Sequence, residues 1–102
     1  MVNPLLKGLR PIHPGEVLRE DVLPALGRPK AEIARLLGIS RQTLYDILNE
    51  RQPVTPAMAL RFAKLLGGSA ESWVDMQRNY DLVIAEKAMA MELRAIPTLK
   101  AA

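Results

Sequence analysis

Cysteine is absent from this sequence of 102 residues, and aromatic residues make up only 4% of it. Without cysteine, the chain has no disulfide, no thiolate zinc site and no cysteine nucleophile. Its single histidine, His13, leaves only scattered carboxylates to complete a metal site, so we expect neither a metal nor a cofactor. The serines have no second base at catalytic spacing, so an enzyme is the least favoured class of function. His13 is instead expected to cap or precede the first helix.

Long apolar runs and targeting signals are missing as well. No stretch approaches the roughly 18 consecutive apolar residues of a membrane span, and the N-terminus has no signal-peptide pattern. We therefore expect a cytoplasmic protein with no membrane partner. Gly67 and Gly68 are better explained as a helix stop than as a phosphate-cradling loop, and no small-molecule substrate is expected.

Apolar residues nevertheless make up 49% of the chain, and they are mainly Leu, Ile, Val, Ala and Met. This mixture favours helices. No segment shows the two-residue alternation of a half-buried strand, and the length fits one domain with a single core. The predicted fold class is all-α.

Apolar periodicity and capping residues predict five helices. The first begins at about Pro14, and Pro24 is expected to end or kink it before Gly27. The second ends at Gly38, and the third begins with Ser40 as its N-cap. The second to fifth helices are expected at about 29–37, 40–49, 56–66 with Thr55 as N-cap, and from Ser69 to beyond Lys87.

The same periodicity predicts which side chains face inward. Trp73 starts the apolar stripe of the fifth helix, so we expect it in the core rather than stacked on a base. The stripe goes on through Met76, Tyr80, Val83 and Ile84. Ala85, Met89, Leu93 and Ile96 continue it beyond the point where a small core needs cover, before Pro97 stops the helix. The inward positions of the second and third helices are Ile33, Ala34, Leu37, Leu44, Ile47 and Leu48.

Two short helices that meet at a glycine turn are the signature of a helix-turn-helix. Ala34 supplies a small residue where the helices cross, Gly38 forms the turn, and Ile39 is an apolar residue inside it. In this motif the first residues of the second helix enter the DNA major groove. We therefore expect a core at residues 13–68 that follows an N-terminal arm at 1–12. Residues 69–102 form a C-terminal helix and tail of the same domain.

The polar side chains at the start of the third helix suit base reading. Gln42 can pair with adenine, Arg41 can fork onto guanine or hold a phosphate, and Thr43 can touch thymine or the backbone. Tyr45 and Asp46 follow one turn later, where the tyrosine suits phosphate and the aspartate can accept from cytosine or repel wrong partners. The alternative is that these are ordinary surface residues of an amphipathic helix.

Positive charge is concentrated in the middle of the chain. The net charge is +3, and residues 28–64 hold seven basic and three acidic side chains, a local charge of +4. A polyanion-binding face needs such a distribution, although a solvated basic surface would also show it. We predict DNA backbone contacts from six residues. For the three in the loop between the third and fourth helices, Arg51, Gln52 and Thr55, the alternative is that Pro53 and Pro56 merely stiffen the loop. The six are Arg28, Lys30, Ser40, Arg51, Gln52 and Thr55.

The segments "HPGEVLREDVLPALG", "AEIARLLGISRQTLYDILNERQPVTPAMALRFAKLLG" and "SWVDMQRNYDL" resemble HigA-type antitoxins of the Xre class, relatives of the phage Cro and C1 repressors. The resemblance covers about residues 12–97. The helix-turn-helix part is shared by many repressors, whereas "HPGE" and "QRNYDL" are more particular to this family. Family members often have Ser or Thr at the position of Pro29, so Arg28 and Lys30 are expected to take over its phosphate contact.

The resemblance implies a five-helix, lambda-repressor-like protein with an extended C-terminal helix. It also implies a homodimer that represses its own operon at a pseudo-palindromic operator and neutralises HigB, an mRNA-cleaving toxin encoded beside it. Two alternatives stay open: a solitary Xre-type regulator without a toxin, and a toxin-binding module with little DNA affinity of its own. An exposed apolar stripe usually indicates a partner, here the twin subunit or the toxin. The residues predicted for this interface are Trp73, Tyr80, Ile84, Met89, Leu93 and Ile96.

Overall fold

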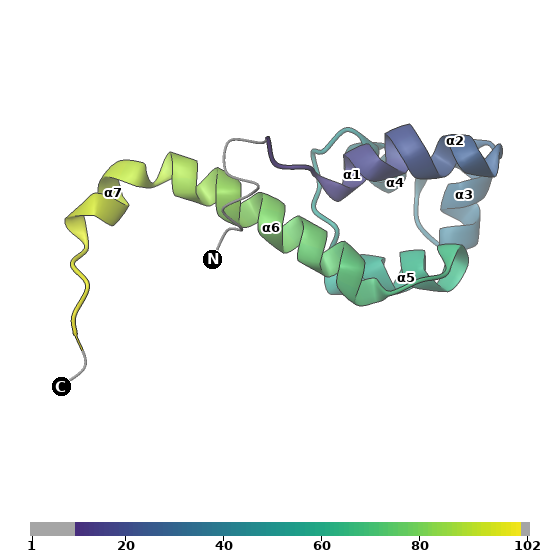
Figure 1. The fold of residues 1–102 in the computed structure, drawn as a ribbon. Coiled ribbons are helices and arrows are strands. Elements are labelled where there is room, and N and C mark those ends of the chain that lie inside the picture. The colour runs from purple at the N-terminus through teal and green to yellow at the C-terminus, as the bar shows by residue number, and fades with distance from the viewer. Residues whose placement is uncertain (1–9, 101–102) are drawn as a thin grey trace.

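The fold was analysed in a computed structural model, which describes residues 10–100. In this range the chain forms helices and turns and no strand, so the all-α prediction is confirmed (Figure 1). Residues 1–9 of the predicted arm lie outside the described residues. No helix in the described range has the length and apolar character needed to cross a membrane.

The first helical region is continuous past its proline. It consists of α1 (Pro14–Val17), a π-helical segment η2 (Leu18–Val22) and α2 (Leu23–Leu26), and it ends at Gly27 with φ of 64°. Pro24 does not end the helix, so that part of the prediction is wrong. Proline has no N–H for the hydrogen bond that a regular α-helix would form at this position. The preceding turn is a wider π turn, in which the Leu23 N–H bonds to the Leu18 carbonyl.

Helices α3 (Lys30–Leu37), α4 (Arg41–Leu48) and α5 (Pro56–Leu66) follow the predicted spans closely. Their ends are set by local chemistry. The Ser40 hydroxyl accepts a hydrogen bond from the Thr43 N–H at 3.0 Å, and the Thr55 hydroxyl accepts one from the Met58 N–H at 3.2 Å. Both are N-caps that satisfy amides left free at the start of a helix.

The core lies among α1 to α5 and the first turns of α6 (Ala70–Ala88). Phe62 is fully buried, and its ring meets the half-buried Trp73 ring edge to face, with centroids 5.2 Å apart. This contact confirms the expected place of Trp73 in the core. The predicted inward positions on α3 and α4 are likewise buried. The buried apolar residues are Leu18, Leu23, Ile33, Ala34, Leu37, Leu44, Ile47, Leu48, Val54, Met58, Ala59 and Phe62.

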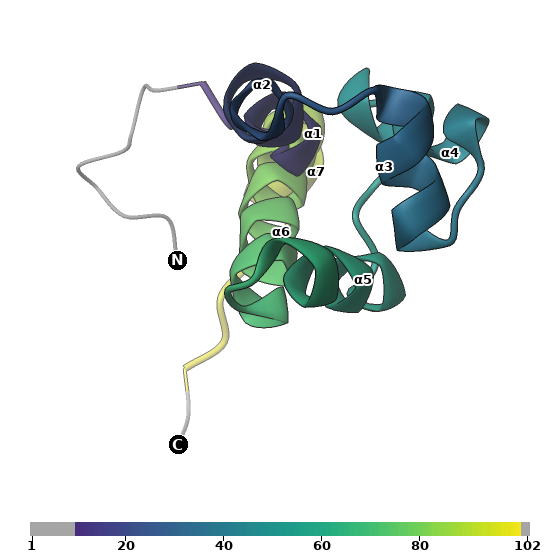
Figure 2. The same ribbon diagram turned by 90° about the vertical axis from the view of Figure 1, so that its right-hand side faces the viewer.

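The C-terminal part projects from this core as an arm (Figure 1), and in Figure 2, where the core faces the viewer, α7 lies behind the core helices. The second half of α6 and the short α7 (Ala90–Ala95) extend away from the other helices, and the molecule measures 55 × 25 × 25 Å. The fifth helix does run beyond Lys87, but it is broken at Met89, whose φ of −106° and ψ of 15° lie outside the helical range. Ile96 is extended because it precedes Pro97, and the helix ends there.

Candidate nucleic-acid interface

The turn between α3 and α4 has the geometry of a helix-turn-helix. Gly38 has φ of 73°, and the Ile39 N–H bonds back to the Ala34 carbonyl at 3.0 Å, which closes α3 with a Schellman motif. Arg61 of α5 donates to the Leu37 carbonyl at 2.7 Å, so the turn is also held from outside the motif. A side chain at Gly38 would meet that guanidinium at 2.8 Å, and it would be strained by the positive φ.

The residues predicted to read bases begin α4 and occupy its next turn. Arg41 and Gln42 are exposed, and Tyr45 is 41% exposed, so these three side chains are accessible to a ligand. Thr43 is half-buried and its hydroxyl accepts a hydrogen bond from the Ser40 hydroxyl at 2.8 Å. The opposite side of α4 faces the core, so the helix presents a polar face outward from a fixed apolar base.

Asp46 interacts with two other residues that are predicted to contact DNA. Its Oδ1 accepts a hydrogen bond from the Gln42 carboxamide at 2.8 Å and lies 3.5 Å from the Arg51 guanidinium. These side chains therefore share one carboxylate, although the sequence places them on a helix and in the following loop. DNA that binds Gln42 or Arg51 must break the interaction of that side chain with Asp46. Such exposed interactions contribute little free energy in water.

The predicted backbone-contacting residues surround this face. Arg28 forms an exposed ion pair with Glu32, and the Lys30 ammonium lies 5.8 Å from the centre of the Tyr45 ring. Lys30 and Tyr45 thus bring the start of α3 beside the exposed side of α4. Ser40 and Thr55 both accept a hydrogen bond as N-caps, and the Ser40 hydroxyl already donates to Thr43, so it must give up that bond to donate to a phosphate.

A second Schellman motif closes α4, where no glycine marks the end of the helix. The Arg51 N–H bonds to the Asp46 carbonyl at 2.8 Å, with Glu50 in the left-handed region at φ of 61°. Arg19 donates to the Leu48 carbonyl and lies 3.4 Å from the Glu50 carboxylate. An arginine therefore holds the end of each helix of the motif, and both come from distant segments.

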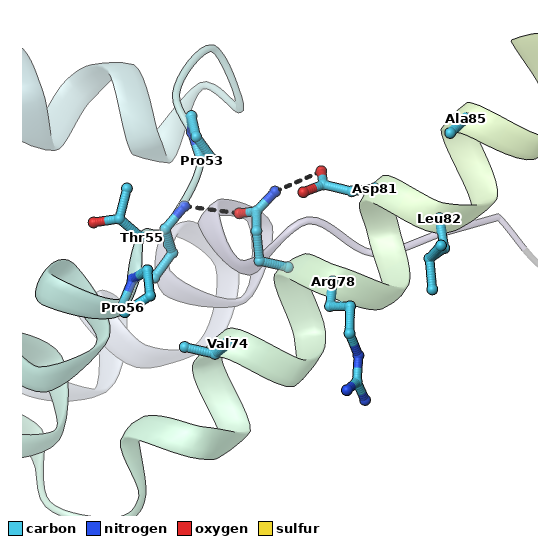
Figure 3. A pocket seen from close by; sticks show the side chains of 10 residues that line it. Pro53, Thr55, Pro56, Val74, Arg78, Asp81, Leu82 and Ala85 are labelled. Atoms are coloured by element: carbon cyan, nitrogen blue, oxygen red, sulfur yellow. Dashed lines mark hydrogen bonds between the residues drawn. The ribbon is translucent and has the colours of Figure 1, made fainter.

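Gln77 of α6 connects the loop before α5 to the long helix. Its side-chain oxygen accepts a hydrogen bond from the Val54 N–H at 2.8 Å, and its amide donates to Asp81 at 3.0 Å (Figure 3). The residue is only 6% exposed. Sequence reasoning missed it, although a carboxamide four residues after Trp73 in an apolar stripe was a usable signal.

Beside these bonds lies an open groove of about 510 Å³, walled by the loop and by α6 (Figure 3). Pro53 and Pro56 line it from the loop side, and Val74, Leu82 and Ala85 line it from α6. The groove is lined mainly by apolar atoms, with Gln77, Arg78 and Asp81 as the polar residues from α6.

His13 caps the first helix, as expected, and joins it to α6. Its Nδ1 accepts a hydrogen bond from the Gly15 N–H at 2.9 Å, and its ring packs edge-on against Tyr80 with centroids 4.9 Å apart. The side chain is 2% exposed, and this burial lowers the pKa of His13 below its usual 6.5, against smaller opposite effects of Glu50 and Asp81. The "HPGE" and "QRNYDL" segments are therefore in contact.

The residues predicted for a dimer or partner interface divide into two groups. Trp73 and Tyr80 are half-buried against Phe62 and His13, so they pack on the core of their own chain. The other four are exposed, by 43% to 62%, on the outer half of α6, at the break and beyond it. They are Ile84, Met89, Leu93 and Ile96, which we call the arm surface.

Comparisons with known proteins agree with this architecture. The sequence profile described as helix-turn-helix matches residues 18–73. Virulence-associated protein I of Dichelobacter nodosus is 41% identical over 76 residues, which span 74% of this chain and 70% of that protein.

Two solved structures are similar over nearly the whole fold. The Pseudomonas aeruginosa antitoxin HigA with the higBA promoter has 35% identity and a TM-score of 0.84, and the match covers 89% of this chain and 100% of that one. The antitoxin GraA in complex with its operator has 37% identity and the same TM-score, with 100% and 99% of the two chains covered.

Proposed function

The chain belongs to the HigA-type antitoxins of the helix-turn-helix family, and on this basis we propose that it represses transcription by binding its own operator through α4. One observation carries the proposal. The exposed start of α4, with Arg41 and Gln42, is fixed by the Ser40 cap and by arginines at the ends of both helices. A helix that is held at both ends and presents exposed polar side chains at its start suits major-groove reading.

The proposed roles follow from chemistry and position. Gln42 and Arg41 read bases, with Thr43, Tyr45 and Asp46 beside them, and the surrounding basic and hydroxyl groups contact phosphates. The solved relatives bound to promoter or operator DNA support DNA as the ligand. The phosphate-contacting residues of this proposal are Arg28, Lys30, Ser40, Arg51, Gln52 and Thr55.

We further propose that the active species is a homodimer. A palindromic operator is matched by a two-fold symmetric protein, with the two reading helices one helical turn of DNA or a multiple of it apart. The arm surface supports this because its apolar side chains are exposed and no other helix within residues 10–100 covers them. Sedimentation equilibrium would test it, with a monomer that persists at micromolar concentrations as the contrary result.

Fluorescence anisotropy tests the DNA-binding proposal directly. The purified protein is titrated onto a duplex from its own promoter and onto a scrambled duplex at one near-physiological salt concentration. We expect much tighter binding to the promoter, by roughly 10³-fold or more for a specific regulator. Equal, weak binding to both duplexes would contradict the proposal.

The loop residue Arg51 gives a second prediction. Arg51→Ala is expected to weaken binding to promoter and scrambled DNA alike, because a phosphate contact has no sequence information. The slope of log K against log salt should fall by about 1 for each protomer, or about 2 for a bound homodimer. Glu71→Ala, at an exposed position at the start of α6, serves as a charge-changing control and should leave this slope unchanged.

Neutralisation of an mRNA-cleaving toxin is the remaining part of the proposal. It is supported by family membership and by the arm surface, whose exposed apolar side chains can also bind a second partner. Co-expression with a small basic protein encoded next to this gene, followed by purification of one chain, would test it. A neighbour that does not co-purify would favour a solitary regulator.

A further inference from the structure

Gln77 is a polar residue in a position that otherwise suits an apolar one. It is 6% exposed, and both ends of its carboxamide are hydrogen-bonded, to Val54 at 2.8 Å and to Asp81 at 3.0 Å (Figure 3). A backbone N–H can only donate, so the oxygen of the carboxamide must face Val54 and the nitrogen must face Asp81. The orientation of the side chain is thereby fixed.

The hydrogen bond between Gln77 and Val54 attaches the end of the loop that follows α4 to α6. Val54 is 2% exposed and follows Pro53, and the next residue, Thr55, caps α5. A buried N–H without a partner is unfavourable, so the Val54 amide needs an acceptor at this point. Gln77 supplies it from a helix 23 residues further along the chain.

This anchor lies between two functional parts of the molecule. On one side are Arg51 and Gln52, which extend from the end of α4 and are proposed to contact DNA phosphates. On the other side is α6, whose outer half contributes to the arm surface. The position of the loop relative to the dimer axis therefore depends on how the loop is joined to α6.

We propose that Gln77 is a positioning residue for DNA binding, which holds the loop at residues 50–55 where Arg51 and Gln52 reach the DNA backbone. The proposal rests on the proposed operator-binding function. Gln77 itself touches no DNA, and Asp81 assists by fixing the orientation of its carboxamide. The effect should appear as lost phosphate contacts, not as altered base preference.

Four variants separate the hydrogen bonds from the volume of the side chain. Gln77→Met keeps the length and removes the carboxamide. Gln77→Glu keeps an acceptor for Val54 but places a carboxylate against Asp81. Gln77→Glu combined with Asp81→Asn restores a donor, because the asparagine amide can donate to the new carboxylate. Asn79→Met changes an exposed carboxamide on the same helix and is the matched control.

Amide hydrogen exchange followed by NMR tests the hydrogen bond without any DNA. In Gln77→Met we expect the Val54 amide to lose protection by roughly tenfold or more, the effect of losing a buried partner. The amide of Phe62, in the middle of α5, should keep its protection. An unchanged Val54 amide would overturn the proposal.

Anisotropy titrations over a range of salt concentrations test the function at a temperature where every variant is folded. Gln77→Met should weaken promoter and scrambled binding alike, by roughly tenfold, with a salt slope smaller by about 1 for each protomer. Gln77→Glu should behave similarly, and the added Asp81→Asn change should recover most of the affinity. Asn79→Met should match the unchanged protein.

The outcomes are distinguishable. A merely structural Gln77 would lower the melting temperature and leave the salt slope of the folded variant unchanged, which would overturn the positioning role. If Gln77→Met fails to fold, the comparison of Gln77→Glu with the double variant Gln77→Glu, Asp81→Asn decides. The double variant must then recover the salt slope as well as the stability. If the unchanged protein shows no promoter preference, operator binding has failed as well, and the Val54 exchange result then shows whether the link itself exists.

Discussion

Gly15 lies where the first helix meets the end of α4, and replacing it with alanine should destabilise the protein strongly. An added Cβ would lie 1.8 Å from the Ile47 carbonyl oxygen and 2.9 Å from the Ile47 carbonyl carbon. Both are backbone atoms, so no side-chain rotation relieves the contact. To move from 1.8 Å to the 3.4 Å of ordinary contact, the two elements must separate by about 1.6 Å.

Two effects of opposite sign compete at this position. Alanine is the better helix former and would stabilise α1 by roughly 0.5 to 1 kcal/mol. Overpacking of a dense interior costs typically 1 to 3 kcal/mol, and a clash between backbones belongs at the upper end. We therefore expect a net loss of about 2 to 2.5 kcal/mol, which lowers the melting temperature by roughly 8 to 20 °C for a domain of this size.

Thermal unfolding followed by circular dichroism measures this shift, with Gly27→Ala as the control. At Gly27 a Cβ would meet nothing within 4 Å, and only its φ of 64° opposes the change. That variant should lose about 1 to 2 kcal/mol. A Gly15→Ala protein as stable as the original would refute the claim that this close approach fixes the first helix against α4.

Two further predictions concern residues around the same contact. Because burial lowers the pKa of His13, the unfolded chain takes up a proton below pH 6.5 that the folded chain resists, so stability should be full above pH 6.5 and should decline as the pH falls below it. Urea unfolding at several pH values checks this, and His13→Asn, which can still cap the helix, should weaken the dependence. Glu50→Gly should raise stability by about 0.5 to 1 kcal/mol, because relief of the left-handed backbone outweighs a long, half-buried ion pair with Arg19. A lower urea midpoint for this variant would contradict that balance.

Local signals in the sequence account for most of the helix boundaries. Ser40, Thr55 and Ser69 each accept a hydrogen bond at the N-terminus of a helix, and Gly38 ends one in a left-handed conformation. Such motifs involve residues only a few positions apart, so the sequence is sufficient to find them. The alternation of buried and exposed positions on α3 and α4 follows from the helical period in the same way.

The features that sequence reasoning missed depend on contacts between distant segments. Arg19 reaches Leu48, 29 residues away, and Gln77 reaches Val54 across 23 residues. No local pattern encodes these pairs, because they arise only after the helices have packed. The π turn before Pro24 was missed for a different reason, since a proline within a helical pattern more often ends the helix.

The candidate site was predictable as a set of side chains but not as an arrangement. The sequence placed Arg41 and Gln42 at the start of a helix, and the structure shows them exposed there. It did not indicate that Asp46 engages both Gln42 and Arg51, because the second contact depends on how the chain leaves α4. Their roles toward DNA stay predictions.

The affinity of Gln42→Ala for promoter and scrambled DNA is the measurement that tests the central claim most directly. Loss of one base-reading contact should cost roughly 1 to 3 kcal/mol of discrimination per half-site. We predict weaker binding to the promoter, unchanged binding to scrambled DNA, and hence a smaller ratio between the two affinities. A ratio equal to that of the unchanged protein would mean that Gln42 does not read the operator, and the assignment of base reading at the start of α4 would be contradicted.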